Sequence, residues 1–367
     1  MADLIQASDF AELFRNNTPL LDVRAPVEFA RGAFPAATNI PLLTDSEREA
    51  VGRCYREQGR EAAIDLGHTL VASDERERRL NSWLAYVTAN PGAALYCYRG
   101  GLRSSIVQQW LADAGAAIPK VDGGYKALRR FLIKTLENLA DNDNIVIVAG
   151  KTGSGKTHFI NSLSNSLDLE GRAQHRGSAF GRHPLPQPSQ SDFENQLGID
   201  TLSLEWDQHR RVIIEDESRA IGSLSVPQML HKRMTESPIA VIEETMEQRV
   251  STIHLDYIQS NYAEFHTAFP DNADALFAES LSSSLLKIKR RLGDEAYLLI
   301  NGLLQQALEK QFSGQGIDDH RLWIAELLTR YYDPMYEYQL GRKSDRIVFR
   351  GSRDELANWI KPMTEAN

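Results

Sequence analysis

Residues 145–157 read IVIVAGKTGSGKT, an uninterrupted apolar run that leads directly into a glycine-rich loop. The run of β-branched residues is typical of a strand that is buried on both faces of a parallel sheet. The loop fits the pattern G-x-x-x-x-G-K-S/T, in which backbone N–H groups surround phosphate oxygens at the start of a helix. The sequence therefore predicts a P-loop, followed by a helix over residues 158–167. The residues expected to bind phosphate are Gly150, Gly153, Ser154, Gly155, Lys156 and Thr157.

A carboxylate partner for this loop is expected at the end of a neighbouring strand. The run RVIIED at residues 211–216 reads as such a strand, and it ends in Glu215 and Asp216. In P-loop proteins a carboxylate at this position and the loop hydroxyl hold Mg²⁺. We therefore expect one of these two carboxylates to serve the ion, with Thr157 and Asp216 as candidate ligands. The loop would accept any diphosphate, because no N-K-x-D motif marks a guanine pocket.

The best domain boundary is ADNDN at residues 140–144, which is polar and turn-prone. We expect a small α/β domain over residues 1–138 and a P-loop NTPase-like α/β domain over residues 139–367. From about residue 250 the spacing of apolar residues becomes mainly helical, which predicts a helical C-terminal extension. Besides the two strands already named, strands are expected at 19–24, 95–98, 238–244 and 346–351, and helices at 8–16, from about 104 to 115, and 126–140.

The composition is that of a soluble globular protein. The chain has 367 residues, of which 42% are hydrophobic and 25% charged, and a net charge of −9. The acidic balance argues against a protein that coats nucleic acid, although it allows a local basic groove. No apolar stretch is long enough to span a bilayer, and the N-terminus lacks the features of a signal peptide. With only two cysteines a disulfide framework is excluded, so we expect a cytoplasmic protein without membrane association.

One of these cysteines lies in an unusual setting. Residues 95–105 read LYCYRGGLRSS, which places Cys97 at the end of an expected strand. Nearby cations and a helix N-terminus favour the reactive thiolate, and two glycines allow N–H groups to point at one spot beside the sulfur. We therefore expect Cys97 to be a nucleophile and Ser104 to cap the following helix, whereas Cys54 is expected to be structural. The expected anion cradle comprises Arg99, Gly100, Gly101, Arg103 and Ser104.

Two chemistries use a cysteine in such a cradle. One is sulfur or selenium transfer, and the other is phosphate ester hydrolysis by a C-x5-R phosphatase. Five residues separate Cys97 from Arg103, which is the phosphatase spacing and one more than most rhodaneses have. One observation argues against a phosphatase: the residue before Cys97 is Tyr96, whereas the classical phosphatases have His at that position. The longer loop leaves room for a tetrahedral oxyanion.

RNA contacts are expected on the loop after the P-loop helix, where HRGSAFGR at residues 175–182 combines cations with an aromatic ring. Cations fix the phosphate backbone, and single-stranded bases stack on aromatic rings. A second basic segment, KIKRR at 287–291, lies on an expected helix, and the tyrosines between 331 and 338 are expected to be packing residues. The candidate RNA-binding residues are Arg172, His175, Arg176, Phe180 and Arg182.

The segment LDVRAPVEFARGAFPAATNIPL at residues 21–42, with YCYRGGLRS at 96–104, resembles the rhodanese pattern. A rhodanese-like domain followed by a P-loop domain is a rare pairing. The whole chain resembles the tRNA 2-selenouridine synthases, from the first strand almost to the C-terminus. The segments that carry this resemblance are GREAAIDLGH (59–68), VDGGYKALR (121–129), HRGSAFGR (175–182), EDESRAIG (215–222) and YYDPMYEYQL (331–340).

The resemblance implies a function that spacing alone does not. This family replaces the sulfur at C2 of wobble 2-thiouridine in tRNA by selenium, with selenophosphate as the donor. It also transfers a geranyl group from geranyl diphosphate to that sulfur, and the S-geranyl base is the implied intermediate. By motif match, Cys97 takes the nucleophile position and residues 150–157 the P-loop position. No tightly bound organic cofactor is implied, and Mg²⁺ is an optional companion of the diphosphate.

Two other functions remain open from the residues themselves. One is a P-loop ATPase or kinase fused to a C-x5-R phosphatase-like domain. The other is a non-enzymatic sulfur-carrier or tRNA-binding module, in which the P-loop only senses a nucleotide.

Overall fold

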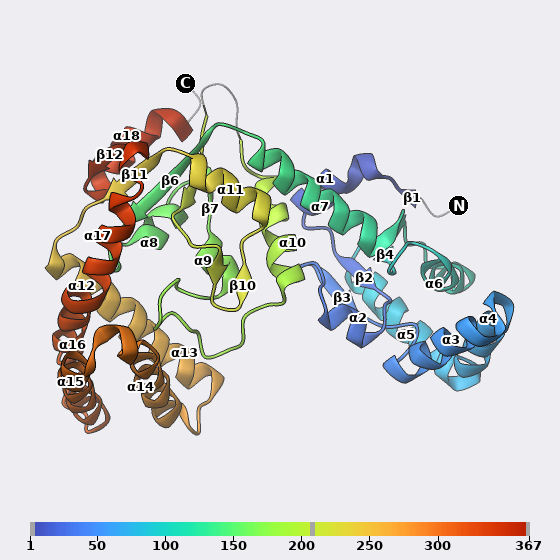
Figure 1. The fold of residues 1–367 in the computed structure, drawn as a ribbon. Coiled ribbons are helices and arrows are strands. Elements are labelled where there is room, and N and C mark those ends of the chain that lie inside the picture. Colours follow the sequence, from blue (N-terminus) through green and yellow to red (C-terminus); the bar gives the residue numbers. More distant parts are fainter. Residues whose placement is uncertain (1–3, 206–209, 365–367) are drawn as a thin grey trace. The chain divides into compact units, whose positions relative to one another are not determined.

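The computed structural model describes residues 4–205 and 210–364. The chain forms two compact units, whose elements are labelled in Figure 1. Unit 1 comprises Met1–Asn138 and Ser189–Ser203, and unit 2 comprises Leu139–Pro188 and Leu204–Asn367. The chain thus leaves unit 1 after residue 138. It then returns to unit 1 at residues 189–203. The sequence instead predicted two domains that are each continuous along the chain.

Unit 1 is built on a five-stranded sheet in the order β1-β5-β4-β2-β3, and all its paired strands are parallel. Three consecutive helices, α3 to α5, separate β3 from β4, and the sequence reading did not include them. The strands are β1 (Leu4–Ile5), β2 (Leu20–Asp22), β3 (Ala37–Asn39), β4 (Ala94–Tyr96) and β5 (Lys120–Val121). The helices are α1 (Phe10–Arg15), α2 (Pro26–Ala30), α3 (Asp45–Gln58), α4 (Arg60–Leu70), α5 (Ser73–Ala89), α6 (Leu102–Asp113), α7 (Gly124–Ala140) and α10 (Gln190–Thr201).

Both faces of this sheet are buried, which explains why its strands read as continuous apolar runs. Successive side chains of a strand point to opposite faces. Accordingly Leu21 and Leu95 join the core that contains Trp83, whereas Leu20 and Tyr96 join the core on the other face. The expected strands at 19–24 and 95–98 therefore form the centre of the unit, and the C-terminal end of β4 carries Cys97.

Helix α10 belongs to unit 1 because its contacts are made there. The amide of Asn195 accepts a hydrogen bond from Arg129 of α7 at 3.0 Å and donates one to the carbonyl of Ala33 at 2.7 Å. A Cβ at Gly198 would lie 2.8 Å from Cβ of Leu132, so only glycine allows this close approach of the two helices. No composition shift marks residues 189–203 in the sequence, which is why the return of the chain was not expected.

Unit 2 contains a second parallel sheet, in the order β12-β11-β6-β8-β7, with the P-loop strand β6 in the middle. The expected strands at 211–216, 238–244 and 346–351 are β8, β11 and β12. The strands are β6 (Ile145–Gly150), β7 (Ser166–Leu167), β8 (Val212–Glu215), β11 (Ile239–Ile242) and β12 (Ile347–Gly351), and a separate antiparallel pair is β9 (Ala220–Ile221) and β10 (Leu224–Ser225).

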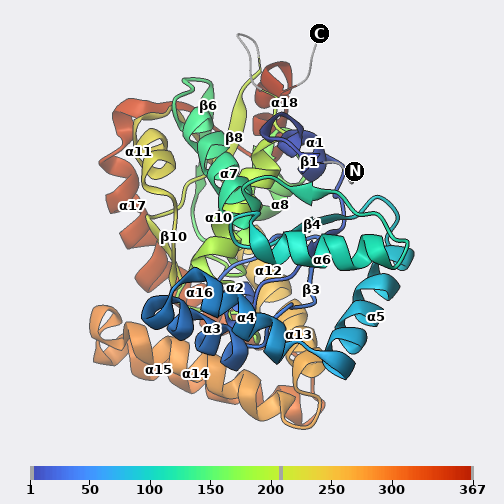
Figure 2. The ribbon, with the colours of Figure 1, turned by 90° about the vertical axis from the view of Figure 1, so that its right-hand side faces the viewer.

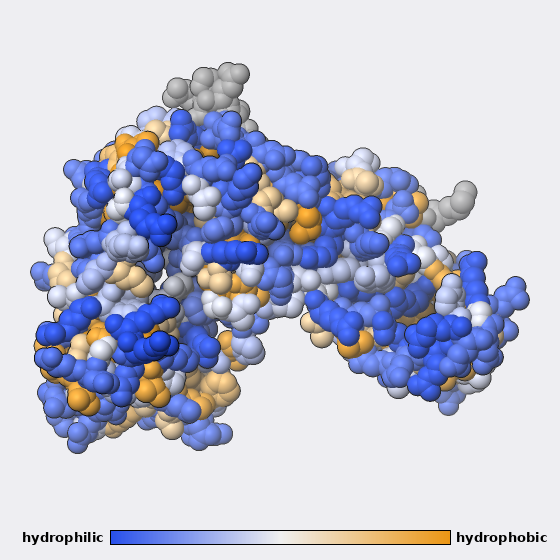
Figure 3. Space-filling view, viewed as in Figure 1, coloured by the Kyte–Doolittle hydropathy of each residue, from blue (hydrophilic) through white to orange (hydrophobic). Residues whose placement is uncertain are grey.

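The C-terminal half of unit 2 is mainly helical, as expected, and Figure 2 shows α14 and α15 as its longest helix pair. Isolated hydrophobic side chains lie among hydrophilic ones on the surface over these helices (Figure 3), as is normal for helices that face solvent. The helices are α8 (Lys156–Asn161), α9 (Leu169–Ala173), α11 (Gln228–Glu236), α12 (Met246–Ile253), α13 (Asn261–Ala268), α14 (Ala273–Leu292), α15 (Asp294–Phe312), α16 (His320–Leu327), α17 (Asp333–Gly341) and α18 (Arg353–Thr364), with π-helical segments at His254–Ser260 and Leu328–Tyr332.

The helix after the P-loop is shorter than expected. It ends at Asn161, and Ser166 and Leu167 instead form the edge strand β7. The side chain of Ser162 donates to the carbonyl of Phe159 at 2.7 Å, and that of Ser166 donates to the carbonyl of Ile160 at 2.6 Å. Serine side chains compete in this way for backbone groups, so the serine-rich second half of the segment ends the helix.

Among the described residues, no helix combines the length and the apolar character that crossing a membrane requires.

Candidate functional site

The P-loop connects β6 to α8, and its six expected phosphate-binding residues lie together on it. Gly153 and Gly155 have φ of +82° and +74°, conformations that favour glycine. The ammonium of Lys156 donates to the carbonyl of Gly150 at 2.9 Å. The hydroxyl of Ser154 is buried and has no hydrogen-bond partner among the described residues. The loop therefore holds polar groups that a bound anion could satisfy, and their role in phosphate binding stays a prediction.

Side chains from the helical half of unit 2 hold this loop in place. Arg249 of α12 donates to the carbonyl of Thr152 at 2.9 Å and forms a bidentate ion pair with Asp333 at the start of α17. Lys151 pairs with Glu337, one turn further along α17, at 2.7 Å. A Cβ at Gly153 would lie 2.6 Å from the carbonyl oxygen of Arg249. The P-loop is thus packed directly against α12, a contact that the sequence reading did not foresee.

A cluster of three glutamates lies beside the hydroxyl of the P-loop. Thr157 donates to Glu170 of α9 at 2.8 Å, and the backbone N–H of Glu170 donates to Glu215 at 2.7 Å. Carboxylate oxygens of Glu170, Glu215 and Glu217 all lie within 4.8 Å of one another. Burial, and then the charge of Glu170, raise the pKa values of both Glu215 and Glu217 well above the ordinary value.

Asp216 does not belong to this cluster. Lys343 contacts both of its carboxylate oxygens at 2.7 Å. Consecutive residues at a strand end point to opposite sides, so Asp216 turns away when Glu215 turns toward the P-loop hydroxyl. Glu215 is thus the carboxylate that contacts Glu170, the partner of Thr157, and the expected pairing of Thr157 with Asp216 around Mg²⁺ stays a prediction.

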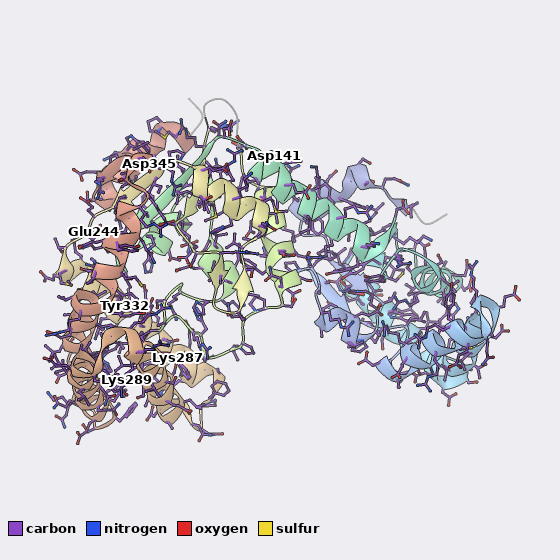
Figure 4. The ribbon with its side chains drawn as sticks, viewed as in Figure 1. Asp141, Glu244, Lys287, Lys289, Tyr332 and Asp345 are labelled. Atoms are coloured by element: carbon purple, nitrogen blue, oxygen red, sulfur yellow. The ribbon has the colours of Figure 1, made fainter. Side chains whose placement is uncertain are left out.

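A cavity of about 860 Å³ extends from the P-loop into the helical half of unit 2. Its wall mixes polar and charged side chains, such as Lys156, Thr157 and Lys343, with apolar and aromatic ones. Tyr332, labelled in Figure 4, is one of the aromatic residues. The apolar and aromatic residues of the wall are Met234, Ile253, Tyr257, Tyr332, Met335, Tyr336 and Leu340.

The tyrosines between residues 331 and 338 are only partly the packing residues that the sequence predicts. Tyr332 is buried, but its hydroxyl and that of Tyr336 have no hydrogen-bond partner among the described residues. Tyr338, by contrast, is 69% exposed. Tyr257 and Tyr332 both come from π-helical segments, which occur frequently at functional sites. Two unsatisfied hydroxyls in a cavity wall are groups that a ligand could engage.

The expected RNA-binding loop lies at the edge of this cavity, where Arg176 and His183 contribute to the wall. Both pair with Glu264, at 2.9 and 2.6 Å. Arg172 and Arg182 are exposed, whereas His175 is buried, and burial together with Arg182 lowers its pKa to about 4.

Phe180 does not fit the expected role as a stacking platform for bases. It is only 4% exposed and packs against Trp323 of α16, with the ring centres 5.5 Å apart. It thus belongs to the core of the helical half, so its ring is not available to a base.

Cys97 lies at the C-terminal end of β4 in unit 1 and is 3% exposed. Its Sγ is 3.3 Å from the hydroxyl of Ser104, which also donates to the carbonyl of Gly101 at 2.9 Å. Helix α6 begins at Leu102, close to the expected start near Ser104, and its N-cap residue is Gly101. The expectation that Ser104 caps the helix is wrong: Ser104 lies within the first turn and contacts the thiol.

The cysteine loop is fixed by the start of α7. The N–H groups of Tyr125 and Lys126 donate to the carbonyls of Cys97 and Tyr98 at 2.9 and 3.0 Å. Gly124 has φ of +57°, and a Cβ there would lie 2.2 Å from the carbonyl oxygen of Cys97. The glycine pair in VDGGYKALR thus allows the two loops to meet.

The two arginines of the loop have different surroundings. Arg103 forms a bidentate ion pair with Glu28 of α2, with N–O distances of 2.5 and 3.1 Å. Although burial acts in the opposite direction, this pairing lowers the pKa of Glu28. Arg99 is exposed and has no ion pair among the described residues. Across those residues, none of the backbone N–H groups of residues 99–103 donates to a protein acceptor. Arg99 and these N–H groups remain available to an anion.

Comparison with known proteins gives matches along the whole chain. Residues 143–367 match the family model described as the tRNA 2-selenouridine synthase AAA domain. The tRNA 2-selenouridine synthase of Marinobacter nauticus is 45% identical over 99% of this chain and 100% of its own. That of Azotobacter vinelandii is 48% identical over 96% of both chains. A crystal structure, the N-terminal domain of a putative ATP/GTP binding protein from Clostridium difficile 630, covers 36% of this chain and 99% of its own at 29% identity, with a TM-score of 0.31.

Proposed function

The chain belongs to the tRNA 2-selenouridine synthase family, and on this premise we propose that it is the transferase that replaces sulfur by selenium at C2 of wobble 2-thiouridine in tRNA. The reaction has two steps, a geranyl transfer to the sulfur and a displacement of the geranylated sulfur by selenium. Unit 2 serves the first step and unit 1, as a rhodanese-like domain, serves the second.

The cavity of unit 2 carries this proposal, because apolar and aromatic side chains line it together with the P-loop. Geranyl diphosphate has the same two parts, a diphosphate and a hydrocarbon tail. The P-loop N–H groups and Lys156 would receive the diphosphate, and the wall around Tyr257, Met335 and Leu340 would cover the tail. In the transfer, the bond from C1 of the geranyl group to the diphosphate oxygen breaks and a bond from C1 to the thiouridine sulfur forms. Groups that hold the departing diphosphate stabilise the charge that develops on it.

Unit 1 offers the features that selenophosphate requires. The exposed guanidinium of Arg99 and the unpaired N–H groups of residues 99–103 can receive a tetrahedral anion beside Cys97. The selenium of selenophosphate then attacks C2 of the modified base, the C2–S bond breaks and the geranylated sulfur leaves as a thiol. Water attacks phosphorus and breaks the P–Se bond, which releases phosphate and leaves the selenium on C2. Without the geranyl group the sulfur would be a poor leaving group, which gives the first step its purpose.

Exposed cations near the cavity support tRNA binding by unit 2. Lys287, labelled in Figure 4, lies near enough to Arg182 that their like charges interact, and together with burial this lowers the pKa of Lys287. Neither side chain has an ion pair among the described residues. Two adjacent cations without an ion pair in the described part of the chain fit a phosphate backbone, and Arg172 and Arg176 are further candidate contacts.

Mass spectrometry of tRNA nucleosides from cells that lack the protein tests this function. We expect loss of both 2-selenouridine and S-geranyl-2-thiouridine, with restoration by the wild-type gene. An ATPase or kinase fused to a phosphatase-like domain predicts unchanged nucleosides together with nucleotide turnover. A sulfur-carrier or tRNA-binding module predicts unchanged nucleosides and a persulfide on Cys97. Unchanged nucleosides would therefore contradict the proposal.

A further inference from the structure

Tyr98 follows Cys97 directly in the chain, and its side chain is 39% exposed. Tyr96 and Tyr125, by contrast, are buried in the core of unit 1. The ring of Tyr98 belongs neither to the anion cradle nor to the wall of the P-loop cavity. A single exposed aromatic side chain is common on a protein surface, so its exposure alone indicates no function. The contacts that hold the ring beside Cys97 are the informative feature.

The core of unit 1 holds this ring in place. The ring of Tyr98 stacks with that of Tyr125, with the ring centres 6.2 Å apart and an angle of 22° between the planes. The guanidinium carbon of Arg24 lies 3.9 Å from the ring centre of Tyr125, and Arg24 is itself buried and paired with Asp22 at 2.6 Å. The backbone N–H of Lys126 donates to the carbonyl of Tyr98 at 3.0 Å. An aromatic ring fixed in this way loses little conformational freedom when a ligand binds to it.

Cations accompany the exposed ring. The guanidinium carbon of Arg99 lies 5.9 Å from the ring centre of Tyr98. Lys126, whose backbone contacts that of Tyr98, is exposed and has no ion pair among the described residues. Proteins that bind single-stranded nucleic acid combine an aromatic ring, on which a base stacks, with cations that contact the phosphates. Tyr98, Arg99 and Lys126 offer both parts beside the expected nucleophile.

We propose that the wobble base of tRNA stacks on the ring of Tyr98 when this base reaches Cys97. An anion held by Arg99 and a base on this ring would be neighbours, so the stacking would bring C2 of the base close to the selenium. The identity of the base rests on the proposed function, whereas the stacking of a nucleobase on this ring does not. The sequence predicted such a role for Phe180, which is buried.

Photo-crosslinking of the full-length protein tests this contact without requiring any reaction of the enzyme. The probe is an anticodon stem-loop RNA with 4-thiouridine at the wobble position, a base that bonds to contacting side chains under long-wave ultraviolet light. Mass spectrometry of the peptides identifies the crosslinked residue. We expect a crosslink at Tyr98 in the wild type. Tyr55→Ala is the matched control, because it removes another exposed tyrosine of unit 1, on α3, and it should leave this crosslink unchanged.

Selenation of tRNA that already carries S-geranyl-2-thiouridine supplies a second readout. Tyr98→Ala should raise the KM for this tRNA about tenfold, because the stacked ring is lost. The KM for selenophosphate should stay within about twofold of wild type, since Arg99 and the N–H groups of the loop remain. Tyr98→Phe keeps the ring and should match the wild type in both values. Tyr98→Leu keeps apolar bulk against Tyr125 but has no ring, so it should resemble Tyr98→Ala and serves if that variant does not fold.

Absence of a crosslink at Tyr98 in the wild type would overturn the proposal, as would a wild-type KM for tRNA in both Tyr98→Ala and Tyr98→Leu. The two measurements also separate this proposal from the proposed function. A crosslink at Tyr98 in a protein that does not selenate the RNA would leave the stacking contact in place and contradict the function. Selenation that is unaffected by the loss of the ring would support the function and contradict the stacking contact.

Discussion

The cysteine site of unit 1 and the P-loop cavity of unit 2 both receive anions in our account, but they are built differently. The surroundings of Cys97 consist largely of backbone, held by the glycine contacts and N–H bonds between residues 97–100 and 123–126. The P-loop cavity collects side chains from many elements, and Arg249, paired with Asp333, holds the P-loop through the carbonyl of Thr152. A site made of backbone depends on the space between two loops, whereas a site made of side chains depends on particular charges.

The largest expected effect concerns the charged side chain at the centre of the P-loop. Lys156→Ala should lower geranyl transfer by about 10²–10³-fold, because a preorganised charge that stabilises the leaving diphosphate is lost. Selenation of tRNA that already carries the geranyl group should stay close to wild type. Single-turnover assays with the two tRNA substrates measure both steps, and equal loss of the two would show that the sites do not divide the reaction.

In unit 1 the cysteine site is built mainly of backbone. We therefore expect a single added methyl group, rather than the loss of a charge, to destabilise it. Gly124→Ala should cost about 3 kcal/mol of unfolding free energy, since a strained φ is combined with a clash against the carbonyl of Cys97. Gly115→Ala is the matched control in the same unit: its φ of +83° is also unfavourable, but its surroundings are open. It should cost only about 1 kcal/mol. Urea unfolding measures both, and equal costs would contradict a tight contact between the loops.

A smaller effect separates the two arginines of the cysteine loop. Arg99→Ala should raise the KM for selenophosphate about tenfold while stability is unchanged, because a charge-assisted contact to the anion is lost. Arg103→Ala should instead destabilise the protein by about 1–2 kcal/mol, because Glu28 loses its bidentate ion pair and keeps only the contacts with Arg48 and the N–H of Ala25. Steady-state kinetics measures the KM for selenophosphate of both variants, and urea unfolding measures their stability. The reverse pattern would make Arg103 the anion ligand.

The smallest effect is a pH dependence located in unit 2. Burial, with a contribution from His254, lowers the pKa of His320 to about 4. Its Nδ1 accepts a hydrogen bond from the indole of Trp323 at 2.9 Å, so the folded state requires the neutral ring. Because the unfolded chain binds the proton first, stability falls as the pH drops from about 6.5 toward 4, by about 1 kcal/mol at pH 5.5.

Urea unfolding at pH 7.5 and 5.5 tests this dependence, with His320→Gln as the comparison. The variant has a stability cost at both pH values, but its loss between them should be smaller by that amount. An unchanged difference between the two pH values would exclude His320 as the titrating group.

The contrast between local backbone and side chains from distant elements also explains which features could be predicted from the sequence. The P-loop and the cysteine loop were recognisable because their residues are consecutive and their spacing is set by local backbone geometry. The strands β2, β4, β6, β8 and β11 were recognisable because burial on both faces requires continuous apolar runs.

Features that depend on distant contacts were not predictable in this way. Glu170 has no local signal of a functional site, and only the fold brings it to Thr157. Phe180 looked exposed because it lies among glycine and arginine, but Trp323 covers it from more than a hundred residues away. Spacing along a strand end does not reveal that Lys343 pairs with Asp216, because Lys343 lies more than a hundred residues away in the chain.

The division of labour between the two sites is tested most directly by the nucleosides of tRNA from cells whose only copy of the protein carries Cys97→Ser. Ser differs from Cys by one atom, so the loop and the whole of unit 2 should stay intact. Mass spectrometry should then find S-geranyl-2-thiouridine accumulated and 2-selenouridine absent. Normal levels of 2-selenouridine, or the loss of both nucleosides, would contradict the assignment of selenium transfer to Cys97 and of geranyl transfer to the P-loop cavity.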